Sequence, residues 1–313
     1  MGQSLIFPGQ GSQAVGMGQA LAHSYDEAKQ VFAAVDDALN QNLSALMWNG
    51  PEDELTLTEN AQPALMAVSM AVVRVLEARG LDIASQASYL AGHSLGEYAA
   101  LTAGGAIELQ DSARLLKLRG QAMQRAVPVG VGAMAALLGL EFDAVVEITA
   151  QATQGDEICG AANDNANGQV VISGHAVAVA RAIDLAKESG AKRAMQLPVS
   201  APFHCALMQP AADEMRAALQ DVEIKVPCVP IIANVIAEPV SDAEAIRGLL
   251  VEQVTGSVRW RESMIWLAEH DAGDLLELGS GKVLTGMARR IDPRLTAKAL
   301  NTPEDIDGFL AAE

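Results

Sequence analysis

Aromatic residues and positive charges are scarce in this chain of 313 residues. Phe, Trp and Tyr together make up 4% of it, although 50% of the residues are hydrophobic, so the core must consist mainly of aliphatic side chains and Met. Lys and Arg number 21 against 39 Asp and Glu, which gives a formal net charge of −18. A chain this acidic offers no basic stripe to neutralise phosphates, so nucleic acid is excluded as an expected partner.

Long apolar runs and cysteines are also few. The longest apolar run, near Ala64–Val73, ends at Arg74 and falls short of the ~18 residues that a membrane span requires. The N-terminus lacks the basic segment of a signal peptide. Cys159, Cys205 and Cys228 are odd in number and far apart, which favours reduced thiols over disulfides or a zinc site. We therefore expect a cytoplasmic protein that does not contact a membrane.

The order of the predicted elements is typical of an α/β protein that carries a small insertion. Strands alternate with helices on both sides of the insertion, which indicates a parallel sheet covered by helices. After the Gly- and Pro-rich stretch 128–132 the order becomes strand, helix, strand, strand, helix, strand, the ferredoxin-like split unit. We predict a large domain formed by 1–127 and 199–313, with a ferredoxin-like subdomain at 128–198 inserted into it. Predicted helices include Gln19–Leu39, Pro63–Arg79 and Asp111–Ala126, the last capped by Asp111 or Ser112.

The segment most informative about function is Gly92-His93-Ser94-Leu95-Gly96. The apolar run Ala87–Ala91 predicts a strand before it, and Glu97–Thr102 predicts a helix after it. A serine between glycines on a sharp strand-to-helix turn is a nucleophile elbow, and the helix directs free N–H groups at an oxyanion formed there. The alternative is a glycine-rich turn with an ordinary capping serine. We interpret Ser94 as a nucleophile in a hydrolase-like α/β fold.

A serine nucleophile needs a base, and His204 is the best placed of the five histidines. It ends an apolar loop, Val199–His204, without a nearby charge, and such surroundings favour a neutral imidazole that accepts a proton. The alternative at this position is a purely structural histidine. His93 is adjacent to Ser94 on a strained turn, and its side chain should point away from the hydroxyl. No aspartate stands out as a third member of a triad, but a carbonyl orients an imidazole equally well.

Arg119 is the second informative residue, because it lies on the apolar face of the predicted helix Asp111–Ala126. Its neighbours on that face are Leu115, Ala122, Met123 and Ala126. A guanidinium on an apolar face must find an anion or incur a large desolvation cost. The anion is either a buried carboxylate of this protein or the carboxylate of a substrate, and the sequence leaves both open.

Two glycine-containing loops fail the patterns of phosphate-binding loops. Pro8–Gly18 has neither Gly-x-Gly-x-x-Gly nor Gly-Lys-Ser/Thr, and around Gly279–Lys282 the positions of the required Gly and Ser/Thr hold Leu276 and Val283. The first loop follows a predicted strand and is expected to pack beside the elbow. There it can donate one backbone N–H to an oxyanion, while Leu95 donates another.

Together these segments resemble the malonyl-CoA:acyl-carrier-protein transacylase family of fatty-acid synthesis, over essentially the whole chain. The resemblance rests on Phe7–Gln13, Gly92–Glu97, Arg119-Gly120, Gly168–Gly174, Phe203-His204 and Gly281–Gly286. It implies that Ser94 is the acylated nucleophile and that His204 is its base. It further implies that the backbone N–H groups of Gln10 and Leu95 form the oxyanion hole, and that the backbone carbonyl of Gln253 orients the histidine.

The resemblance also implies a substrate site. Arg119 would bind the malonyl carboxylate, and Phe203 and Asn163 would belong to the same site. In related acyltransferases the residue before the histidine is commonly Phe in malonyl-selective enzymes and Ser in methylmalonyl-selective ones, so Phe203 favours malonyl. One methyl group in a pocket is worth only ~1–3 kcal/mol, so this selectivity is expected to be incomplete.

The chain departs from the family pattern at three prolines. Ser280, Ser257 and Asn167 stand where the family usually has Pro. We expect each replacement to loosen its loop. A looser loop at Ser257, which follows Gln253, would affect the alignment of His204.

The function implied is transfer of a malonyl group from malonyl-CoA to the phosphopantetheine thiol of acyl carrier protein, through a malonyl-serine intermediate. Coenzyme A enters as a substrate thioester, and no cofactor or metal is expected. The alternatives are the malonyl-transfer subunit of a malonate decarboxylase, a polyketide acyltransferase, a serine thioesterase and a non-catalytic carrier-binding scaffold.

The carrier-protein partner implies a local basic surface. Acyl carrier proteins are acidic, and so is this chain, so docking requires a positive patch against the global field. The candidates are Lys192, Arg193, Lys282, Arg289 and Arg290. The alternative is that these are scattered solvated charges.

Overall fold

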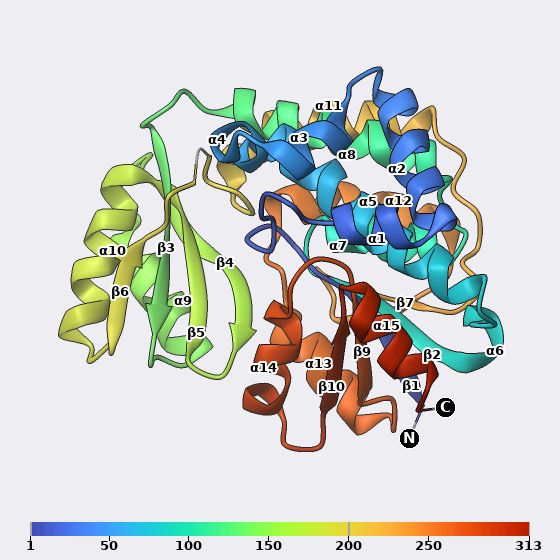
Figure 1. The fold of residues 1–313 in the computed structure, drawn as a ribbon. Helices are drawn as coiled ribbons and strands as arrows, with labels where there is room; N and C mark the ends of the chain where they lie inside the picture. The colour runs from blue at the N-terminus through green and yellow to red at the C-terminus, as the bar shows by residue number, and fades with distance from the viewer. Residues whose placement is uncertain (1, 200, 313) are drawn as a thin grey trace.

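The computed structural model describes residues 2–199 and 201–312. A six-stranded sheet has the order β10-β9-β1-β2-β7-β8 (Figure 1). Its strands are β1 (Gln3–Phe7), β2 (Ala87–Gly92), β7 (Ile231–Ala233), β8 (Glu238–Val240), β9 (Asp274–Leu278) and β10 (Thr296–Leu300). Every neighbouring pair is parallel except β7 and β8. The prediction of a parallel sheet is therefore wrong at one edge, because β8 follows β7 too closely for a crossover and returns antiparallel.

Helices cover both faces of this sheet, as expected. Successive residues of β1 point to opposite faces, so Leu5 and Phe7 pack in one core with α2, α5 and α8, whereas Ile6 packs in another with α13 and α14. The helices outside the insertion are α1 (Gln19–Ser24), α2 (Asp26–Leu39), α3 (Leu43–Asn49), α4 (Glu52–Thr56), α5 (Thr58–Glu77), α6 (Ile83–Gln86), α7 (Gly96–Ala103), α8 (Leu109–Ala126), α11 (Gln209–Gln220), α12 (Ala243–Thr255), α13 (Trp260–Glu269), α14 (Val283–Ile291) and α15 (Pro303–Leu310). A short 3-10 helix, η1 (Ala206–Met208), precedes α11.

A second, wholly antiparallel sheet lies to one side of the first (Figure 1). Its order is β4-β5-β3-β6, formed by β3 (Gly132–Leu138), β4 (Cys159–Ala166), β5 (Gln169–His175) and β6 (Arg193–Gln196). Helices α9 (Phe142–Ala152) and α10 (Ala176–Glu188) pack on it around a separate apolar core. The element order confirms the ferredoxin-like unit. The domain boundaries at 128 and 198 stay a prediction.

Two predicted helices differ in detail from the structure. The expected helix Gln19–Leu39 is broken at Tyr25, whose backbone is extended and whose hydroxyl donates to Asp307 at 3.0 Å. The helix expected to begin at Pro63 begins at Thr58, because the segment before the proline, buried except for Glu59, packs as part of the same helix. No helix of the described residues is long and apolar enough to cross a membrane.

Helix α8 begins earlier than predicted. Its N-cap is Glu108, so the assignment of Asp111 or Ser112 as the cap is wrong. Ser112 instead lies buried inside the helix and shares a hydrogen bond with Thr102. The short helices α3, α4 and α6 and the edge strand β8 carry too few residues for a periodic pattern, and the sequence did not predict them.

Candidate active site

Ser94 lies on the turn between β2 and α7, with a left-handed backbone at φ 53°. A Cβ on Gly92 would lie 1.9 Å from the carbonyl carbon of Gly96, and a Cβ on Gly96 would lie 2.3 Å from the oxygen of Phe7. Both positions therefore require glycine, because a side chain at Gly92 would push away the start of α7 and one at Gly96 would separate the elbow from the first strand. The backbone N–H of Ser94 donates to Oδ1 of Asn234 at 2.8 Å. The predicted strand, turn and helix are confirmed.

His204 lies within hydrogen-bond distance of the serine. Its Nε2 is 2.8 Å from Oγ of Ser94, and its Nδ1 is 2.8 Å from the backbone oxygen of Gln253. A carbonyl only accepts, so Nδ1 carries the proton and Nε2 is free to accept the serine hydroxyl. Burial, aided by the positive charge of Arg119, lowers the pKa of His204 to about 3. His93 bonds instead to Oδ1 of Asn165 through Nε2, at 2.8 Å.

Arg119 is buried, 2% exposed, beside the serine. Its Nη1 donates to Oε1 of Gln62 at 2.7 Å, and its Nη2 donates to Oε1 of Gln253 at 2.9 Å and to Oγ of Ser94 at 3.2 Å. Among the described residues no carboxylate forms an ion pair with this guanidinium. Of the two partners that the sequence left open, the buried protein carboxylate is therefore absent from its contacts. The guanidinium is held by neutral oxygens and keeps its charge available to an anion.

The loop after β1 packs against the elbow. A Cβ on Gly9 would lie 2.7 Å from the backbone oxygen of His93, so the two turns touch. Gln10 and Leu95 line the same cavity as Ser94. In the described chain no hydrogen bond occupies the backbone N–H of either residue. Both amides are therefore available as donors at this cavity, and their role as an oxyanion hole stays a prediction.

One cavity of about 960 Å³ connects these groups. Ser94, Arg119 and His204 line it together with Phe203 and Asn163, the two other residues predicted for the substrate site. Its apolar wall comes from both units of the fold, with Met123, Met134, Val171, Leu197 and Val199. The acidic residues of α4, Glu52 and Asp53, also line it. A small charged acyl group and the apolar part of a longer arm both fit a space of this composition.

Comparison with known proteins supports the family resemblance inferred from the sequence. Residues 4–284 match the acyl transferase domain family. The malonyl CoA-acyl carrier protein transacylase of Escherichia coli strain K12 is 44% identical over 300 residues, 96% of each chain. That of Bacillus subtilis strain 168 is 42% identical over 304 residues, 97% of this chain and 95% of the relative. The chain belongs to the malonyl-CoA:acyl-carrier-protein transacylase family.

Solved structures of this transacylase family share the whole fold. The acyl-carrier-protein-S-malonyltransferase of Bartonella henselae superposes with a TM-score of 0.97 at 54% identity, covering 100% of this chain and 99% of the other. A malonyl-transacylase solved in complex with its type II PKS acyl-carrier protein superposes with a TM-score of 0.96 at 43% identity and full coverage of both chains. The predicted fold class is thereby confirmed.

The side chains that replace the family prolines differ in their contacts. Oγ of Ser280 donates to the backbone oxygen of Ser12 at 2.7 Å, which ties the loop after β9 to the loop after β1. Nδ2 of Asn167 donates to the backbone oxygens of Arg290 and Ile291 at 2.9 and 3.1 Å. Both side chains thus tie their loops to neighbouring segments, and the expected loosening of the loops stays a prediction. The hydroxyl of Ser257 is buried and has no partner among the described residues.

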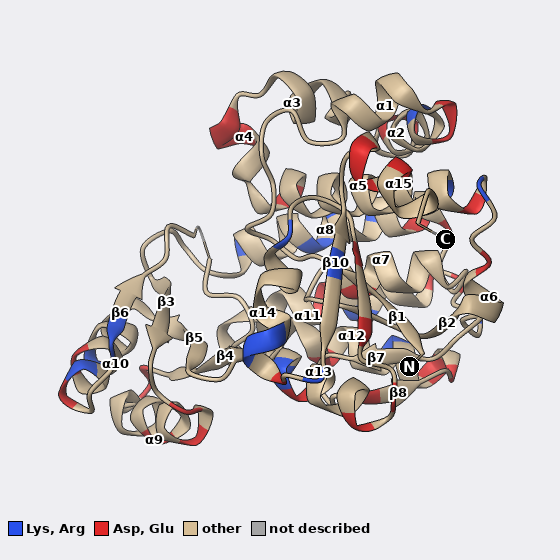
Figure 2. Ribbon diagram, turned by 60° about the horizontal axis from the view of Figure 1, so that its bottom comes forward, with Lys and Arg blue, Asp and Glu red and all other residues tan. Residues whose placement is uncertain are grey.

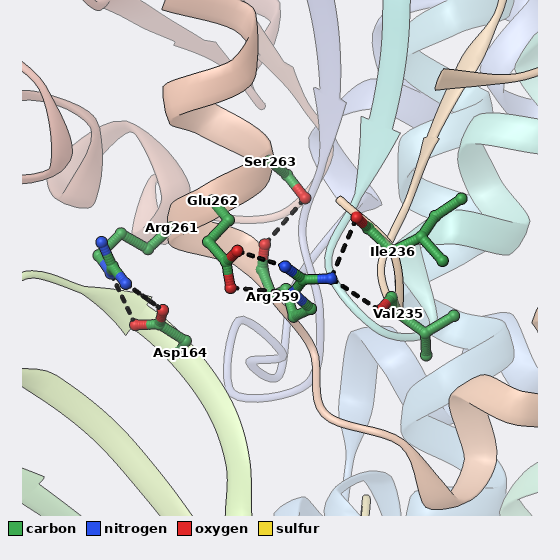
Figure 3. A network of polar contacts seen from close by, with 7 residues as sticks. All are labelled: Asp164, Val235, Ile236, Arg259, Arg261, Glu262 and Ser263. Atoms are coloured by element: carbon green, nitrogen blue, oxygen red, sulfur yellow. Dashed lines mark hydrogen bonds and ion pairs between the residues drawn. The ribbon is translucent and has the colours of Figure 1, made fainter. Parts of the chain in front are cut away.

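Polar contacts join strand β4, which carries Asn163, to helix α13 of the large unit (Figure 3). The buried carboxylate of Asp164 accepts from Nε of Arg261 at 2.9 and 3.0 Å and from its Nη2 at 2.8 Å. Beside it, Arg259 pairs with Glu262 and donates to the backbone oxygens of residues 235 and 236. The backbone of Asp164 also donates to the oxygen of Val258 at 2.9 Å. The small sheet is thereby held against the cavity that both units line.

Sequence reasoning missed several residues that contact the predicted site. Gln62, Asn165, Asn234 and the side chain of Gln253 hold Arg119, His93 and the elbow in place. Amides carry no charge and follow no periodic pattern, so nothing in the sequence distinguishes them. Glu97 stood inside the recognised segment but was given no role, and its carboxylate is 3% exposed.

The five basic residues predicted to dock a carrier are all exposed. Arg193 pairs with Leu138 between β6 and β3, and Leu138 pairs with Gln169 between β3 and β5. Oε1 of Gln169 accepts from Arg290 at 3.0 Å, so Arg193 and Arg290 lie near the same end of the small sheet. Lys192 neighbours Arg193, and Arg289 neighbours Arg290. Lys282 precedes α14 and lies about 12 Å along the helix from these arginines. Figure 2 shows the basic segments on β6 and α14 and an acidic one on α4.

Proposed function

We propose that this protein transfers the malonyl group of malonyl-CoA to the phosphopantetheine thiol of an acyl carrier protein, through a malonyl ester of Ser94. One observation carries the proposal: Oγ of Ser94 lies 2.8 Å from a neutral imidazole and 3.2 Å from a buried guanidinium. The first partner makes the serine a nucleophile, and the second selects an acyl group that ends in a carboxylate. The names of the relatives agree with this chemistry.

In the first half-reaction Ser94 attacks the thioester carbonyl of malonyl-CoA. Nε2 of His204 takes the hydroxyl proton as the Oγ–C bond forms, and the Gln253 carbonyl stabilises the resulting imidazolium through Nδ1. The backbone N–H groups of Gln10 and Leu95 stabilise the oxyanion. The C–S bond then breaks, and His204 returns the proton to the sulfur of coenzyme A.

In the second half-reaction the same groups work in the opposite direction. The thiol of the carrier's phosphopantetheine gives its proton to His204 as its sulfur attacks the malonyl-Ser94 ester. The C–Oγ bond breaks, and Oγ takes the proton back from the imidazolium. Every bond and proton is accounted for by two thiols and the chain's own residues, so the proposed reaction requires no cofactor.

Arg119 supplies the acyl selectivity in this proposal. A charge-assisted hydrogen bond between the guanidinium and the malonyl carboxylate is worth about 1.5–3 kcal/mol, which a neutral acetyl group forgoes. Phe203 and Asn163 lie at the same cavity, and we assign them to the substrate site. The apolar contact of Phe203 favours malonyl over a methyl-branched acyl group by ~1–3 kcal/mol.

We also propose the setting of the reaction. The three cysteines are free, which suits the reducing cytoplasm. The supply of malonyl groups to fatty-acid synthesis is the role that we assign, and a polyketide or malonate decarboxylase system is the alternative with the same chemistry. Rates with purified carriers of these systems distinguish them.

For docking of the carrier we propose the exposed residues Lys192, Arg193, Lys282, Arg289 and Arg290. Within the described chain none of them is paired with a carboxylate, so their charge remains available to an acidic partner.

Intact-mass spectrometry after incubation with malonyl-CoA tests the proposal. The expected result is one malonyl adduct on the wild-type protein, none on Ser94→Ala, and loss of the adduct when a holo carrier protein is added. Free malonate released in place of malonyl-carrier would identify a thioesterase. The absence of any adduct on the wild-type protein would identify a non-catalytic scaffold and overturn the proposal.

A further inference from the structure

Glu97 is a buried carboxylate for which the proposed reaction has no use. It lies in the first turn of α7, three residues after the nucleophile, and is 3% exposed. Its Oε2 accepts from Nε2 of Gln253 at 2.8 Å and from the backbone N–H of Asn234 at 3.1 Å. A buried carboxylate is costly, so a helix next to a reactive serine keeps one only where it forms such contacts.

The side chain of Gln253 lies between this carboxylate and Arg119. Its Oε1 accepts from Nη2 of Arg119 at 2.9 Å, while its Nε2 donates to Glu97 and, at 3.0 Å, to the backbone oxygen of Ser94. A guanidinium only donates and a carboxylate only accepts, so the two groups permit a single orientation of the amide. A reversed amide would direct N–H groups at the guanidinium and oxygen at the carboxylate.

We infer that Glu97 is a positioning residue that fixes the Gln253 amide and thereby presents Arg119 to the carboxylate of the acyl group. This inference rests on the proposed function. The malonyl carboxylate needs the guanidinium in one place, about 3 Å from Oγ of Ser94, and the amide oxygen of Gln253 is one of the two groups that hold it there. Glu97 touches no substrate atom in this arrangement and acts through its neighbour.

The charges around Glu97 are consistent with this role. Burial raises the pKa of Glu97 to about 7, while the hydrogen bonds from Gln253 and Asn234 and the positive charge of Arg119 oppose the rise. The contacts that orient the amide are thus the ones that favour the ionised carboxylate. The backbone carbonyl of Gln253 holds His204 independently of the side chain. Loss of Glu97 should therefore disturb Arg119 more than the base.

The test compares malonyl-CoA with acetyl-CoA, which has no carboxylate for Arg119. In Glu97→Met, which keeps the length of the side chain but accepts no strong hydrogen bond, we expect the malonyl-to-acetyl ratio of kcat/KM to fall about tenfold. The change should appear mainly as a higher KM for malonyl-CoA. In Glu97→Gln the amide oxygen still accepts from Gln253 and Asn234, so the ratio should stay within about threefold of the wild type.

A matched control is available in Glu277→Gln. Glu277 is also a buried carboxylate, 0% exposed, but it accepts from the backbone of α14 at Leu284 and Thr285. This variant should be destabilised in thermal unfolding without a change in the acyl ratio. A general structural defect would lower the rates with both acyl groups together.

Three results would overturn the inference: a wild-type ratio in Glu97→Met, an equal loss in Glu97→Gln and Glu97→Met, or a parallel loss with both substrates. If Glu97→Met does not fold, Glu97→Asp withdraws the carboxylate by one methylene, and an unchanged ratio there would count against the inference as well. The proposed function predicts a malonyl adduct on the wild-type protein whatever the role of Glu97. Detection of that adduct therefore distinguishes failure of this inference from failure of the proposed function.

Discussion

Arg119 shows how one side chain combines a local pattern with long-range packing. Its place on the apolar face of α8 marks it as unusual in the sequence, and its hydrogen-bond partners include side-chain amide oxygens from α5 and α12. Neutral oxygens accept from both Nη atoms without neutralising the charge, and Nε has no partner among the described residues. A buried cation held this way stays attractive to an incoming carboxylate, at the cost of its desolvation.

Arg119→Ala should change acyl preference. We expect kcat/KM with malonyl-CoA to fall about tenfold to a hundredfold, because the charge-assisted contact is lost, while acetyl-CoA reacts at least as fast as before. Steady-state rates with both thioesters and a small acceptor thiol measure the effect. Malonyl turnover that survived the change intact would make Arg119 a structural residue.

The pH dependence of acylation should reflect the buried state of His204. A base fails only when it is protonated, and burial with the nearby guanidinium lowers its pKa from 6.5 to about 3. With acetyl-CoA, which leaves Arg119 unpaired, kcat/KM should stay level from pH 8 down to about pH 5. In Arg119→Ala the acid limb should move to higher pH, since one of the causes of the shift is removed. A wild-type limb near pH 6.5 would contradict the buried, neutral imidazole.

Strand ends bring the groups of the site together. The loop with Gln10 follows β1, Ser94 follows β2, and Asn234 follows β7, all at the carboxyl edge of neighbouring strands in the parallel sheet. Side chains that are distant in sequence meet at this edge because parallel strands end on the same side. The elbow itself needs glycine on both sides of the serine, since the strand, the turn and the helix approach within contact distance.

Gly96→Ala should disrupt the elbow. Its new Cβ would meet the backbone oxygen of Phe7 at 2.3 Å, so the turn must move away from β1, and we expect a loss of about 2–3 kcal/mol in the free energy of unfolding together with loss of acylation. Chemical denaturation and adduct formation measure the two effects.

Gly248→Ala is the control, because this exposed position inside α12 has no atom within 4 Å of the new Cβ. It should gain about 0.5–1 kcal/mol and keep its activity. Equal stability of the two variants would be inconsistent with the packing at Gly96.

Elements with a strong local pattern were predictable, and short or interrupted ones were not. Trp260–Glu269 and Asp274–Leu278 have the predicted limits, because apolar residues recur at helical spacing in the first and form a short, nearly continuous apolar run in the second. The break at Tyr25 carries no Gly or Pro, and packing of its ring and hydroxyl against α15 decides it. The antiparallel direction of β8 likewise depends on a short connection and not on its own residues.

The molecule as a whole combines a strongly negative charge with a partner that is also acidic. Its formal net charge of −18 opposes the approach of a carrier protein, so encounter depends on where the few basic groups lie. The five basic residues proposed for docking lie on or next to β6 and α14, while the first turn of α4 is acidic (Figure 2). We therefore expect the carrier protein to approach from the side of β6 and α14.

Reversal of Lys282 and Arg289 to Glu should raise the KM for the carrier protein severalfold and leave acylation by malonyl-CoA unchanged. The effect should weaken as ionic strength rises, since salt screens exposed charges. Lys29→Glu with Arg74→Glu changes the net charge equally on α2 and α5, away from α14, and serves as control. Unchanged carrier kinetics in the first pair, or equal effects in both, would eliminate this surface as the docking site.

The candidate reactive groups could be predicted from the sequence alone, because each prediction depends on a few nearby residues. Glycines around Ser94, an uncharged loop before His204 and an apolar helix face around Arg119 are local features whose physical consequences hold in any fold. Packing between distant segments chose the neighbours of those groups. Gln62 and Gln253 lie 57 and 134 residues from Arg119, and Glu97 lies 156 residues from Gln253. Neutral amides and a single carboxylate form no periodic pattern in the sequence. The neighbours of Arg119 are therefore known only from the tertiary structure, in which strand ends and helices come together.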